Sequence, residues 1–171
     1  MVEFMGAGVL ISMEEYLRTA YSPDREYVDG VVVERHVGEI PHGIVRSNVV
    51  HWLRQHYPGF RVWPEVRVRT TAWRCRIPDV LVVSDRPRTA VLETPPSIVV
   101  EILSPSDEMS EVIEKLEEYR SIGVRNIWVL DPRRHKAYAF DERGLEEVRG
   151  SELVAVEIGI RLSLRDVFED L

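Results

Sequence analysis

The sequence predicts an α/β (α+β) fold, in which a mixed β-sheet is flanked by helices and extended by antiparallel hairpins. Between residues 77 and 132 three short runs are almost continuously apolar, which is typical of strands buried on both faces. Two longer segments have apolar residues at helical spacing. One of these helices connects two of the buried strands, and such a crossing requires the two strands to be parallel.

The first part of the chain predicts a short helix followed by a hairpin. Ser12 and Glu15 have the spacing of a capping box, so we expect a helix over MEEYLRTA (13–20). The segment REYVDGVVVERH (25–36) places Asp-Gly between two β-favouring runs. This is the strongest short-range signal for a hairpin.

The middle of the chain is expected to form the core. HGIVRSNVVHWLRQHY (42–57) has helical spacing and ends at Pro58-Gly59. A second helix is predicted over 106–123 and a buried strand over 125–132. Between the two helices we expect three strands, namely FRVWPEVRVRT (60–70), IPDVLVVS (77–84) and SIVVEILS (97–104). The predicted core order is therefore helix, three strands, helix, strand.

The end of the chain predicts a hairpin at 136–148, a strand at 152–158 and a last helix at 164–171, capped by Ser163 with Asp166. The 171 residues contain no internal repeat, low-complexity tract or clear interdomain linker. A chain of this length most often forms one domain. We therefore expect a single domain, divided into a helix and hairpin (1–41), a core (42–132) and C-terminal strands with a helix (133–171).

Composition restricts the classes of function. The net charge of −7 argues against a general nucleic-acid coat protein, although it allows an enzyme with a local basic cleft. Cys75 is the single cysteine, so an internal disulfide and a cysteine-built zinc site are excluded. No apolar run approaches the roughly 20 residues that span a bilayer, and the basic start of a secretory signal is absent. We expect no membrane association and a cytoplasmic location.

Two carboxylates stand in strands that the pattern predicts to be buried. Asp79 follows Pro78, and Glu101 is surrounded by Val99, Val100 and Ile102. A buried ionised carboxylate must be paired, protonated or bound to a cation. Two carboxylates on adjacent strands repel each other unless a divalent metal lies between them, and oxygen ligands suit Mg²⁺ or Mn²⁺. A metal ion accounts for both acids at once.

Simpler interpretations of these acids remain open. Asp79 is also expected where an aspartate bonds nearby backbone amides at the start of a strand. Glu101 is equally compatible with an ion pair to Arg76 or Arg125. Arginines gather between residues 61 and 88, where they form either the solvated face of a strand or a phosphate-binding surface.

Lys115 also has two interpretations. Glu111 precedes it by four residues and Glu118 follows it by three, so an exposed ion pair on a helix would explain it. Position 115 also borders the apolar stripe that contains Leu116 and Tyr119. A long side chain at this position can lie along the helix and bring its ammonium group to the ends of the strands.

The order Pro78-Asp79, then EILSPS from Glu101, then a lysine followed four residues later by a tyrosine resembles the Uma-type putative endonucleases. These are a branch of the restriction-endonuclease-like, PD-(D/E)XK nuclease superfamily. The resemblance covers nearly the whole chain, including MEEYL, REYVDG, IPDVLVV, VVEILSPS and EKLEEYRSIGVRNIWVLDP. It implies a restriction-endonuclease-like fold, whose core order of helix, three strands, helix and strand agrees with the order predicted above.

The resemblance also implies a site. Asp79, Glu101 and the backbone carbonyl of Ile102 would hold Mg²⁺ or Mn²⁺. The family's lysine normally stands two residues after the second acid, but Leu103 occupies that place here. The lysine is displaced to the following helix, which points to Lys115 as a catalytic residue.

Further residues match family positions. The third acid would be Glu26, just before the Asp-Gly turn, or Glu65, on the strand before Asp79, and Glu26 is favoured. Glu26 alternatively pairs with an arginine on an exposed hairpin. His42 opens a helix, where it either orients a phosphate or water or closes the loop. Arg76 belongs to the arginines that would support the site or hold flanking phosphates.

The predicted function is a Mg²⁺-dependent endonuclease that hydrolyses phosphodiester bonds of DNA. We expect a homo-oligomer, since cutting both strands favours two copies of the site, and the hairpins at 26–36 and 135–149 are candidate contact surfaces. The alternative is a nucleic-acid-binding or assembly module that retains the nuclease fold without useful turnover.

Overall fold

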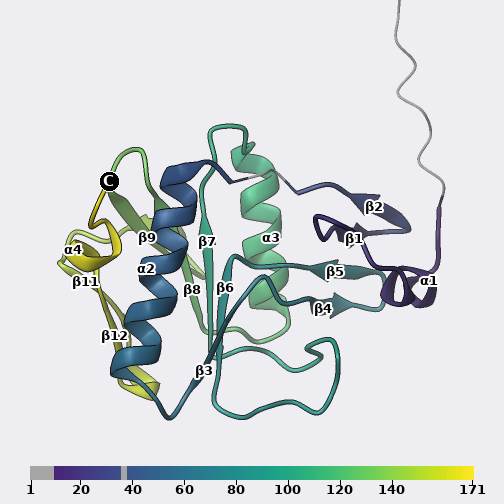
Figure 1. Ribbon diagram of the computed structural model, residues 1–171, viewed down its shortest axis with the longest axis horizontal. Helices are drawn as coiled ribbons and strands as arrows, with labels where there is room; N and C mark the ends of the chain where they lie inside the picture. Colours follow the sequence, from purple (N-terminus) through teal and green to yellow (C-terminus); the bar gives the residue numbers. More distant parts are fainter. Residues whose placement is uncertain (1–9, 36–37) are drawn as a thin grey trace, which may run out of the picture.

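The computed structural model describes residues 10–35 and 38–171 of the chain. Figure 1 shows a central sheet between two long helices, with a smaller sheet and the first helix at one end. The helices are α1 (Met13–Arg18), α2 (Ile40–His56), α3 (Met109–Ser121) and α4 (Leu164–Val167). None of the helices in the described residues is long and apolar enough to cross a membrane.

The central sheet has six strands in the order β10-β9-β8-β7-β6-β3. Their bounds are β3 (Arg61–Pro64), β6 (Val80–Val83), β7 (Ile98–Ile102), β8 (Asn126–Asp131), β9 (Lys136–Asp141) and β10 (Gly144–Glu147). β7 and β8 are parallel, and the other neighbours are antiparallel. The parallel pair flanks α3, which confirms the crossing expected from the sequence.

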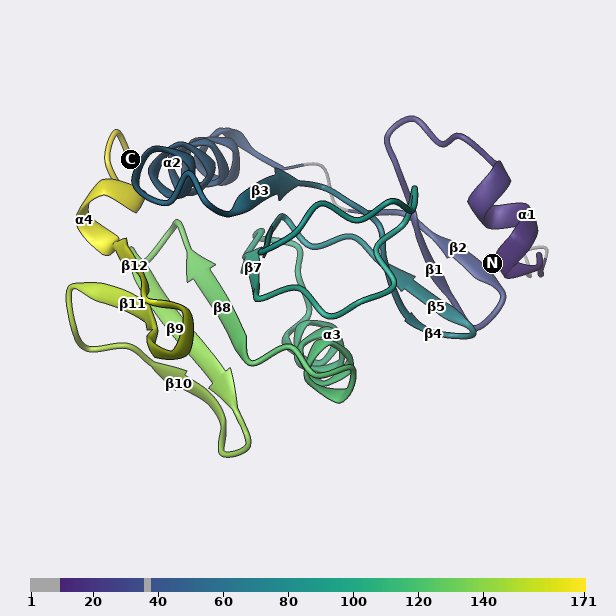
Figure 2. The ribbon, with the colours of Figure 1, turned by 90° about the horizontal axis from the view of Figure 1, so that it is seen from below.

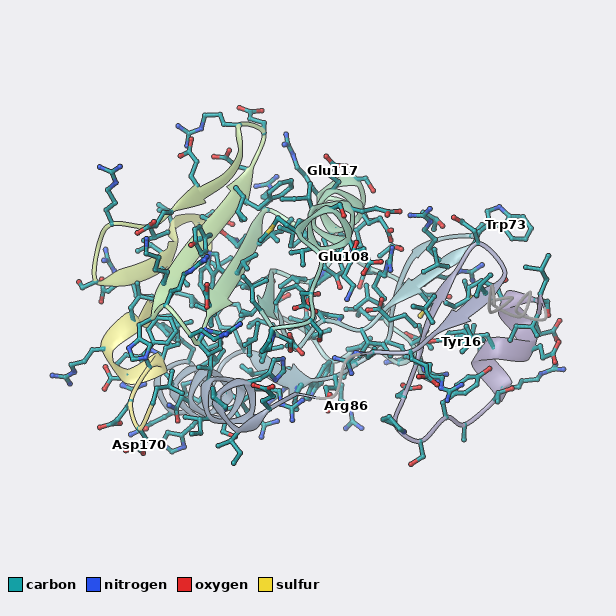
Figure 3. All side chains as sticks on the ribbon, turned by 90° about the horizontal axis from the view of Figure 1, so that it is seen from above. Tyr16, Trp73, Arg86, Glu108, Glu117 and Asp170 are labelled. Atoms are coloured by element: carbon teal, nitrogen blue, oxygen red, sulfur yellow. The ribbon has the colours of Figure 1, made fainter. Side chains whose placement is uncertain are left out.

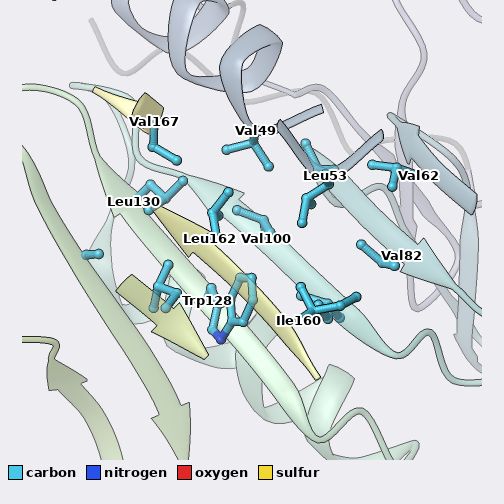
Figure 4. Packing of buried hydrophobic residues seen from close by; sticks show 14 of the residues in the cluster. Val49, Leu53, Val62, Val82, Val100, Trp128, Leu130, Ile160, Leu162 and Val167 are labelled. Carbon is cyan, nitrogen blue, oxygen red and sulfur yellow. The ribbon is translucent and has the colours of Figure 1, made fainter. Parts of the chain in front are cut away.

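The apolar runs of β6, β7 and β8 are buried because helices cover both faces of the sheet, as Figure 2 shows. Alternate residues of each strand point to opposite faces. On one face Val82, Val100 and Trp128 pack against Val49 and Leu53 of α2 (Figure 4). The opposite face packs against α3, with Val99, Ile127, Val129, Leu116 and Tyr119 in one cluster.

A second sheet has the order β2-β1-β5-β4. Its strands are β1 (Glu26–Val28), β2 (Val31–Val33), β4 (Val68–Thr71) and β5 (Arg74–Arg76). The predicted hairpin is confirmed for β1 and β2, where Val28 pairs with Val31 around Asp29 and Gly30. Both turn residues have positive φ, of 51° and 95°, which Asp-Gly tolerates well. His36, at the end of the predicted hairpin, lies outside the described residues.

The prediction of one strand over residues 60–70 is wrong. The chain leaves the central sheet after Pro64 and enters the smaller sheet at Val68, so β3 and β4 belong to different sheets. Between them Glu65 has a φ of 53°, in the left-handed region that ends an extended strand. This break positions the smaller sheet beside the carboxyl-terminal end of β7.

The C-terminal elements differ from the prediction in detail. β9 and β10 form the expected hairpin. β11 (Glu152–Ala155) is shorter than predicted because the chain turns into the 3-10 helix η1 (Val156–Ile158), and it pairs with the unpredicted β12 (Ile160–Ser163). Ser163 caps α4 by accepting a hydrogen bond from the amide of Asp166, as expected, but α4 is only four residues long.

Candidate active site

A cavity of about 220 Å³ lies where the two sheets meet α2 and α3. Its walls come from β1, β2, β5, the start of β6, the end of β7 and the first turns of both long helices. Glu108, one of the wall residues, lies beside α3 in Figure 3, whereas Trp73 lies at the outer end of the smaller sheet. The charged side chains that line the cavity include Glu26, Arg35, Arg76, Asp79, Glu101 and Lys115.

Asp79 and Glu101 are brought together by the antiparallel pairing of β6 and β7. Val80 is opposite Val100, so the next pair in this register is Asp79 opposite Glu101. Oδ2 of Asp79 accepts a hydrogen bond of 2.8 Å from the amide of Ile102. Both carboxylates are buried, with exposures of 5% and 8%. The amide that Asp79 bonds therefore belongs to the neighbouring strand and not to its own turn.

Asp79 has two further partners on its other oxygen. Nε2 of His42, in the first turn of α2, lies 3.2 Å from Oδ1, and Nη2 of Arg35 lies 3.3 Å from the same atom. Burial opposes ionisation of Asp79, but the hydrogen bond and charge of His42, the Ile102 amide and the charge of Arg35 together lower its pKa. Asp79 is therefore an ionised carboxylate held by three groups.

Glu101 has a different environment. Its Oε1 accepts a hydrogen bond of 2.7 Å from the hydroxyl of Tyr119 on α3, and no arginine of the described residues pairs with it. Burial raises the pKa of Glu101 to about 7, the charge of Lys115 opposes this shift, and the carboxylates of Asp79 and Glu26 add to it. The proposed ion pair with Arg76 or Arg125 is therefore wrong, and Glu101 is a carboxylate that a nearby cation would stabilise.

Lys115 points into the cavity and not toward the surface of its helix. Its Nζ lies 3.2 Å from Oε1 of Glu26, and the side chain is 25% exposed. Glu26 is 2% exposed and also accepts hydrogen bonds from Nη1 of Arg76 at 3.0 Å and the amide of Ile77 at 3.1 Å. Burial tends to lower the pKa of Lys115, but Glu101 and Glu26 raise it above its usual value. The exposed pairing with Glu111 or Glu118 is not the arrangement found.

The structure distinguishes between Glu26 and Glu65, the two candidates for the third acid. Glu26 lines the cavity, whereas Glu65 is not among the residues of its wall. Glu65 pairs instead with Nη1 of Arg35 at 3.0 Å and Nη1 of Arg46 at 2.7 Å. The structure therefore brings Glu26, Asp79, Glu101 and Lys115 together in one cavity. Glu65 lies outside the cavity wall and is linked to it through Arg35.

His42 lies against Asp79 with 8% exposure, and its buried Nδ1 has no hydrogen-bond partner among residues 10–35 and 38–171. The neighbouring Gly38 keeps this position possible, since a Cβ built there would approach Nδ1 to 2.6 Å. His42 is therefore a direct neighbour of a candidate metal ligand.

The central arginines are bound within the protein. Arg76 is 6% exposed and bonds Glu118 and Glu26. Arg67 bonds Asp24 and lies over the ring of Tyr16, and Arg74 bonds Asp29 and Glu118. These three side chains form neither a solvated strand face nor an open phosphate-binding surface. Arg76 holds the carboxylate of Glu26 through its hydrogen bond.

Sequence reasoning missed Arg35 and Glu118. Arg35 contacts Asp79, which is 44 residues away, and Glu118 contacts Arg76 across 42 residues. Neither contact has a local spacing pattern that would reveal it. The sequence places Tyr119 in a motif and in the apolar stripe of a helix, but it does not predict the hydrogen bond of Tyr119 to Glu101.

The donor groups are compatible with a hard divalent cation. Within residues 10–35 and 38–171, no three side chains among His, Cys, Asp and Glu form a ready metal cluster. Asp79, Glu101 and the carbonyl of Ile102 nevertheless offer two carboxylates and one carbonyl oxygen in adjacent positions. Mg²⁺ commonly takes one or two protein carboxylates and completes its shell with water and substrate phosphate. The residues therefore fit such an ion.

Comparison with known proteins identifies a shared fold and a family. A solved structure described as a putative nuclease from Anabaena variabilis ATCC 29413 superposes with a TM-score of 0.77 at 19% sequence identity, over 92% of this chain and 97% of that chain, which shows the shared fold. No curated protein matches the chain. The family model Uma2, described as "Putative restriction endonuclease", matches residues 13–171. The chain belongs to this family, whose description supports a nuclease role and hence binding of nucleic acid.

Proposed function

We propose that this protein is a metal-dependent endonuclease that hydrolyses phosphodiester bonds of DNA. One observation carries the proposal, namely that the buried carboxylates of Asp79 and Glu101 meet across β6 and β7 in a cavity that also contains the ammonium group of Lys115. Two carboxylates beside an ammonium group suit a reaction in which negative charge develops on a phosphate. The family description supports the same class of reaction.

Each residue would have a distinct task. Asp79, Glu101 and the carbonyl of Ile102 would hold Mg²⁺ or Mn²⁺, which when bound polarises the phosphate and promotes attack by water. Lys115 would stabilise the negative charge of the transition state, because its raised pKa favours the ammonium form over a neutral base. Glu26, fixed by Arg76 and the Ile77 amide, would orient that ammonium group.

DNA as the substrate and a homo-oligomeric assembly belong to the same proposal. The net charge of −7 requires that DNA be attracted locally. Arg86 and Arg88, which are exposed and form no ion pair within the described residues, are candidates for contacts with flanking phosphates. β2 is an edge strand with Val31 and Val33 each 37% exposed, and this supports pairing with a second copy.

One observation favours the alternative of a nucleic-acid-binding or assembly module without turnover. The guanidinium of Arg35 already contacts Asp79, so a positive charge is present where a metal ligand is proposed. The two functions differ in a measurable property, because an enzyme must bind the divalent cation at Asp79 and Glu101 despite this arginine.

The direct test is cleavage of plasmid, linear and single-stranded DNA with Mg²⁺, with Mn²⁺ and with EDTA. Asp79→Asn and Glu101→Gln should each lower the cleavage rate about 10²–10³-fold, the effect of removing a group that stabilises transition-state charge. Asp131→Asn is the matched control, since Asp131 is equally buried at the end of β8 but, within the described residues, bonds only the amides and side chain of its own turn. Equal cleavage by wild type and by folded Asp79 and Glu101 variants would refute the proposal.

A further inference from the structure

Arg35 lies between two carboxylates. Its Nη2 is 3.3 Å from Oδ1 of Asp79, and its Nη1 is 3.0 Å from Oε1 of Glu65. The side chain is 16% exposed and lines the cavity. Burial tends to lower the pKa of Arg35, but Asp79 and Glu65 raise it, so the group is a permanent cation at this position.

The contact with Asp79 matters because both oxygens of that carboxylate are already engaged. The Ile102 amide occupies Oδ2, and His42 and Arg35 occupy Oδ1. The Ile102 amide belongs to the backbone of β7 and cannot move away without opening the sheet. Of the remaining two partners, Arg35 carries a fixed positive charge and has a second carboxylate within reach.

A guanidinium and a divalent cation compete for the same carboxylate. Each stabilises its negative charge, and their own charges repel when both are close. Contact of Arg35 with Asp79 therefore weakens cation binding, and loss of that contact, with Glu65 still holding Arg35, strengthens it. Arg35 contacts both carboxylates at once in the structure. Because Glu65 does not line the cavity, an arginine held by Glu65 alone would leave Asp79 accessible.

We propose that Arg35 is a positioning residue that sets the divalent-cation affinity of the site by changing from a bridge between Asp79 and Glu65 to a contact with Glu65 alone. The inference rests on the proposed function, since it takes Asp79 to be a metal ligand. It gives Glu65 a role other than that of third acid, because Glu65 draws the competing charge away from the ligand. The contact between Arg35 and Asp79 is the observation that favours a module without turnover. In this proposal the same contact controls metal binding.

The proposal makes two predictions of opposite sign. Arg35→Gln removes the competing charge and should tighten Mn²⁺ binding, whereas Glu65→Gln leaves Arg35 with Asp79 as its remaining carboxylate and should weaken it. A charge within about 4–6 Å changes the proton affinity of a carboxyl group by about 10–1000-fold. A competing metal ion experiences the same field, so we expect changes of about tenfold in each direction.

Arg46 provides the matched control. It is an arginine that pairs with the same Oε1 of Glu65, at 2.7 Å, and it has no contact with Asp79 among the described residues. Arg46→Gln therefore removes an equal charge from the same neighbourhood without removing the competitor. We expect a change in Mn²⁺ affinity of at most about twofold, near the limit of additive effects at separate sites.

The experiment is isothermal titration of the full chain with Mn²⁺ at constant pH and ionic strength, using wild type, Arg35→Gln, Arg35→Lys, Glu65→Gln, Arg46→Gln and Asp79→Asn. Circular dichroism establishes that each variant is folded. Arg35→Lys keeps the charge and should bind like wild type within a few-fold. If Arg35→Gln does not fold, Glu65→Gln still determines the sign: weaker Mn²⁺ binding supports the proposal, and unchanged or tighter binding overturns it.

Tighter binding by Arg35→Gln together with weaker binding by Glu65→Gln supports the proposal. Unchanged or weaker binding by Arg35→Gln overturns it, as does an equal gain in Arg46→Gln, which would be a general charge effect. In both cases, loss of Mn²⁺ binding in Asp79→Asn would still support Asp79 as a metal ligand, and the proposed function would stand. If Asp79→Asn binds Mn²⁺ as wild type does, the proposed function itself fails.

Discussion

The hydroxyl of Tyr119 donates a hydrogen bond of 2.7 Å to Oε1 of Glu101, and both residues are buried. Tyr119 is on α3, one turn after Lys115, and Glu101 is on β7. This bond joins the helix that carries the ammonium group to the strand that carries the candidate metal ligand. The relative position of Lys115 and Glu101 therefore depends on it.

Tyr119→Phe should lower the free energy of unfolding by about 1–3 kcal/mol, because it leaves a buried carboxylate oxygen without its donor. It should also weaken Mn²⁺ binding, since Glu101 loses the group that fixes its orientation. Denaturant unfolding and calorimetric titration measure the two effects. Tyr138→Phe is the control, as the Tyr138 hydroxyl makes no hydrogen bond within the described part of the chain and is only half-buried. Equal effects in both variants would contradict this role of Tyr119.

A second buried pairing lies beneath the site. Arg76 bonds Glu26 through Nη1 at 3.0 Å and Glu118 through Nη2 at 2.5 Å. Arg76→Met would leave two buried carboxylates without their shared cation, and breaking such a pairing costs about 3–5 kcal/mol. Guanidinium chloride unfolding should show this loss. Arg165→Gln, at a side chain that is 90% exposed, should change stability by no more than about 0.5 kcal/mol.

Much of the central sheet is predictable because local and tertiary preferences agree there. β6, β7 and β8 are apolar on both faces, and the helices that cover those faces have their own periodic patterns. The pairing of Asp79 with Glu101 follows, since neighbouring strands bring their polar exceptions together. Their grouping with Lys115 is also anticipated, because position 115 borders the apolar stripe of α3.

The remainder depends on geometry that a sequence pattern does not contain. The break at Glu65 is a single positive φ within an alternating run, and such a run otherwise favours one continuous strand. β5 and β12 are only three and four residues long, too short for a periodic pattern, and β5 acquires one of its partners, β1, from a distant segment. Arg35 reaches Asp79 only because this break and the first hairpin bring their side chains to one edge of the cavity.

The free energy of unfolding should depend on pH through the ionisation of Glu118. Burial works against its ionised form, but the hydrogen bond and charge of Arg76, with further bonds from Arg74 and Thr70, lower its pKa below the usual 4.5. A lowered pKa contributes stability at pH values above the usual pKa, and this contribution disappears as the pH falls through the folded-state pKa. The stability difference between wild type and Glu118→Gln should therefore narrow as the pH falls below about 4.5.

Thermal or denaturant unfolding between pH 3 and 7 measures this difference. Glu117→Gln, on the exposed side of the same helix, is the control and should change stability by less than about 0.5 kcal/mol throughout. A constant difference for Glu118→Gln over the whole range would show that its ionisation does not contribute.

Gly38 and Gly43 flank His42 and allow a matched comparison. A Cβ at Gly38 would lie 2.6 Å from Nδ1 of His42, so Gly38→Ala must displace the imidazole or the backbone at residue 38 and thereby disturb the contact of His42 with Asp79. A Cβ at Gly43 meets nothing within 4 Å, and alanine in a helix is favoured over glycine by about 0.5–1 kcal/mol. Gly43→Ala should therefore stabilise the protein without altering cleavage, while Gly38→Ala should slow cleavage and weaken Mn²⁺ binding. Normal cleavage by Gly38→Ala would show that the contact between His42 and Asp79 is not needed for the reaction.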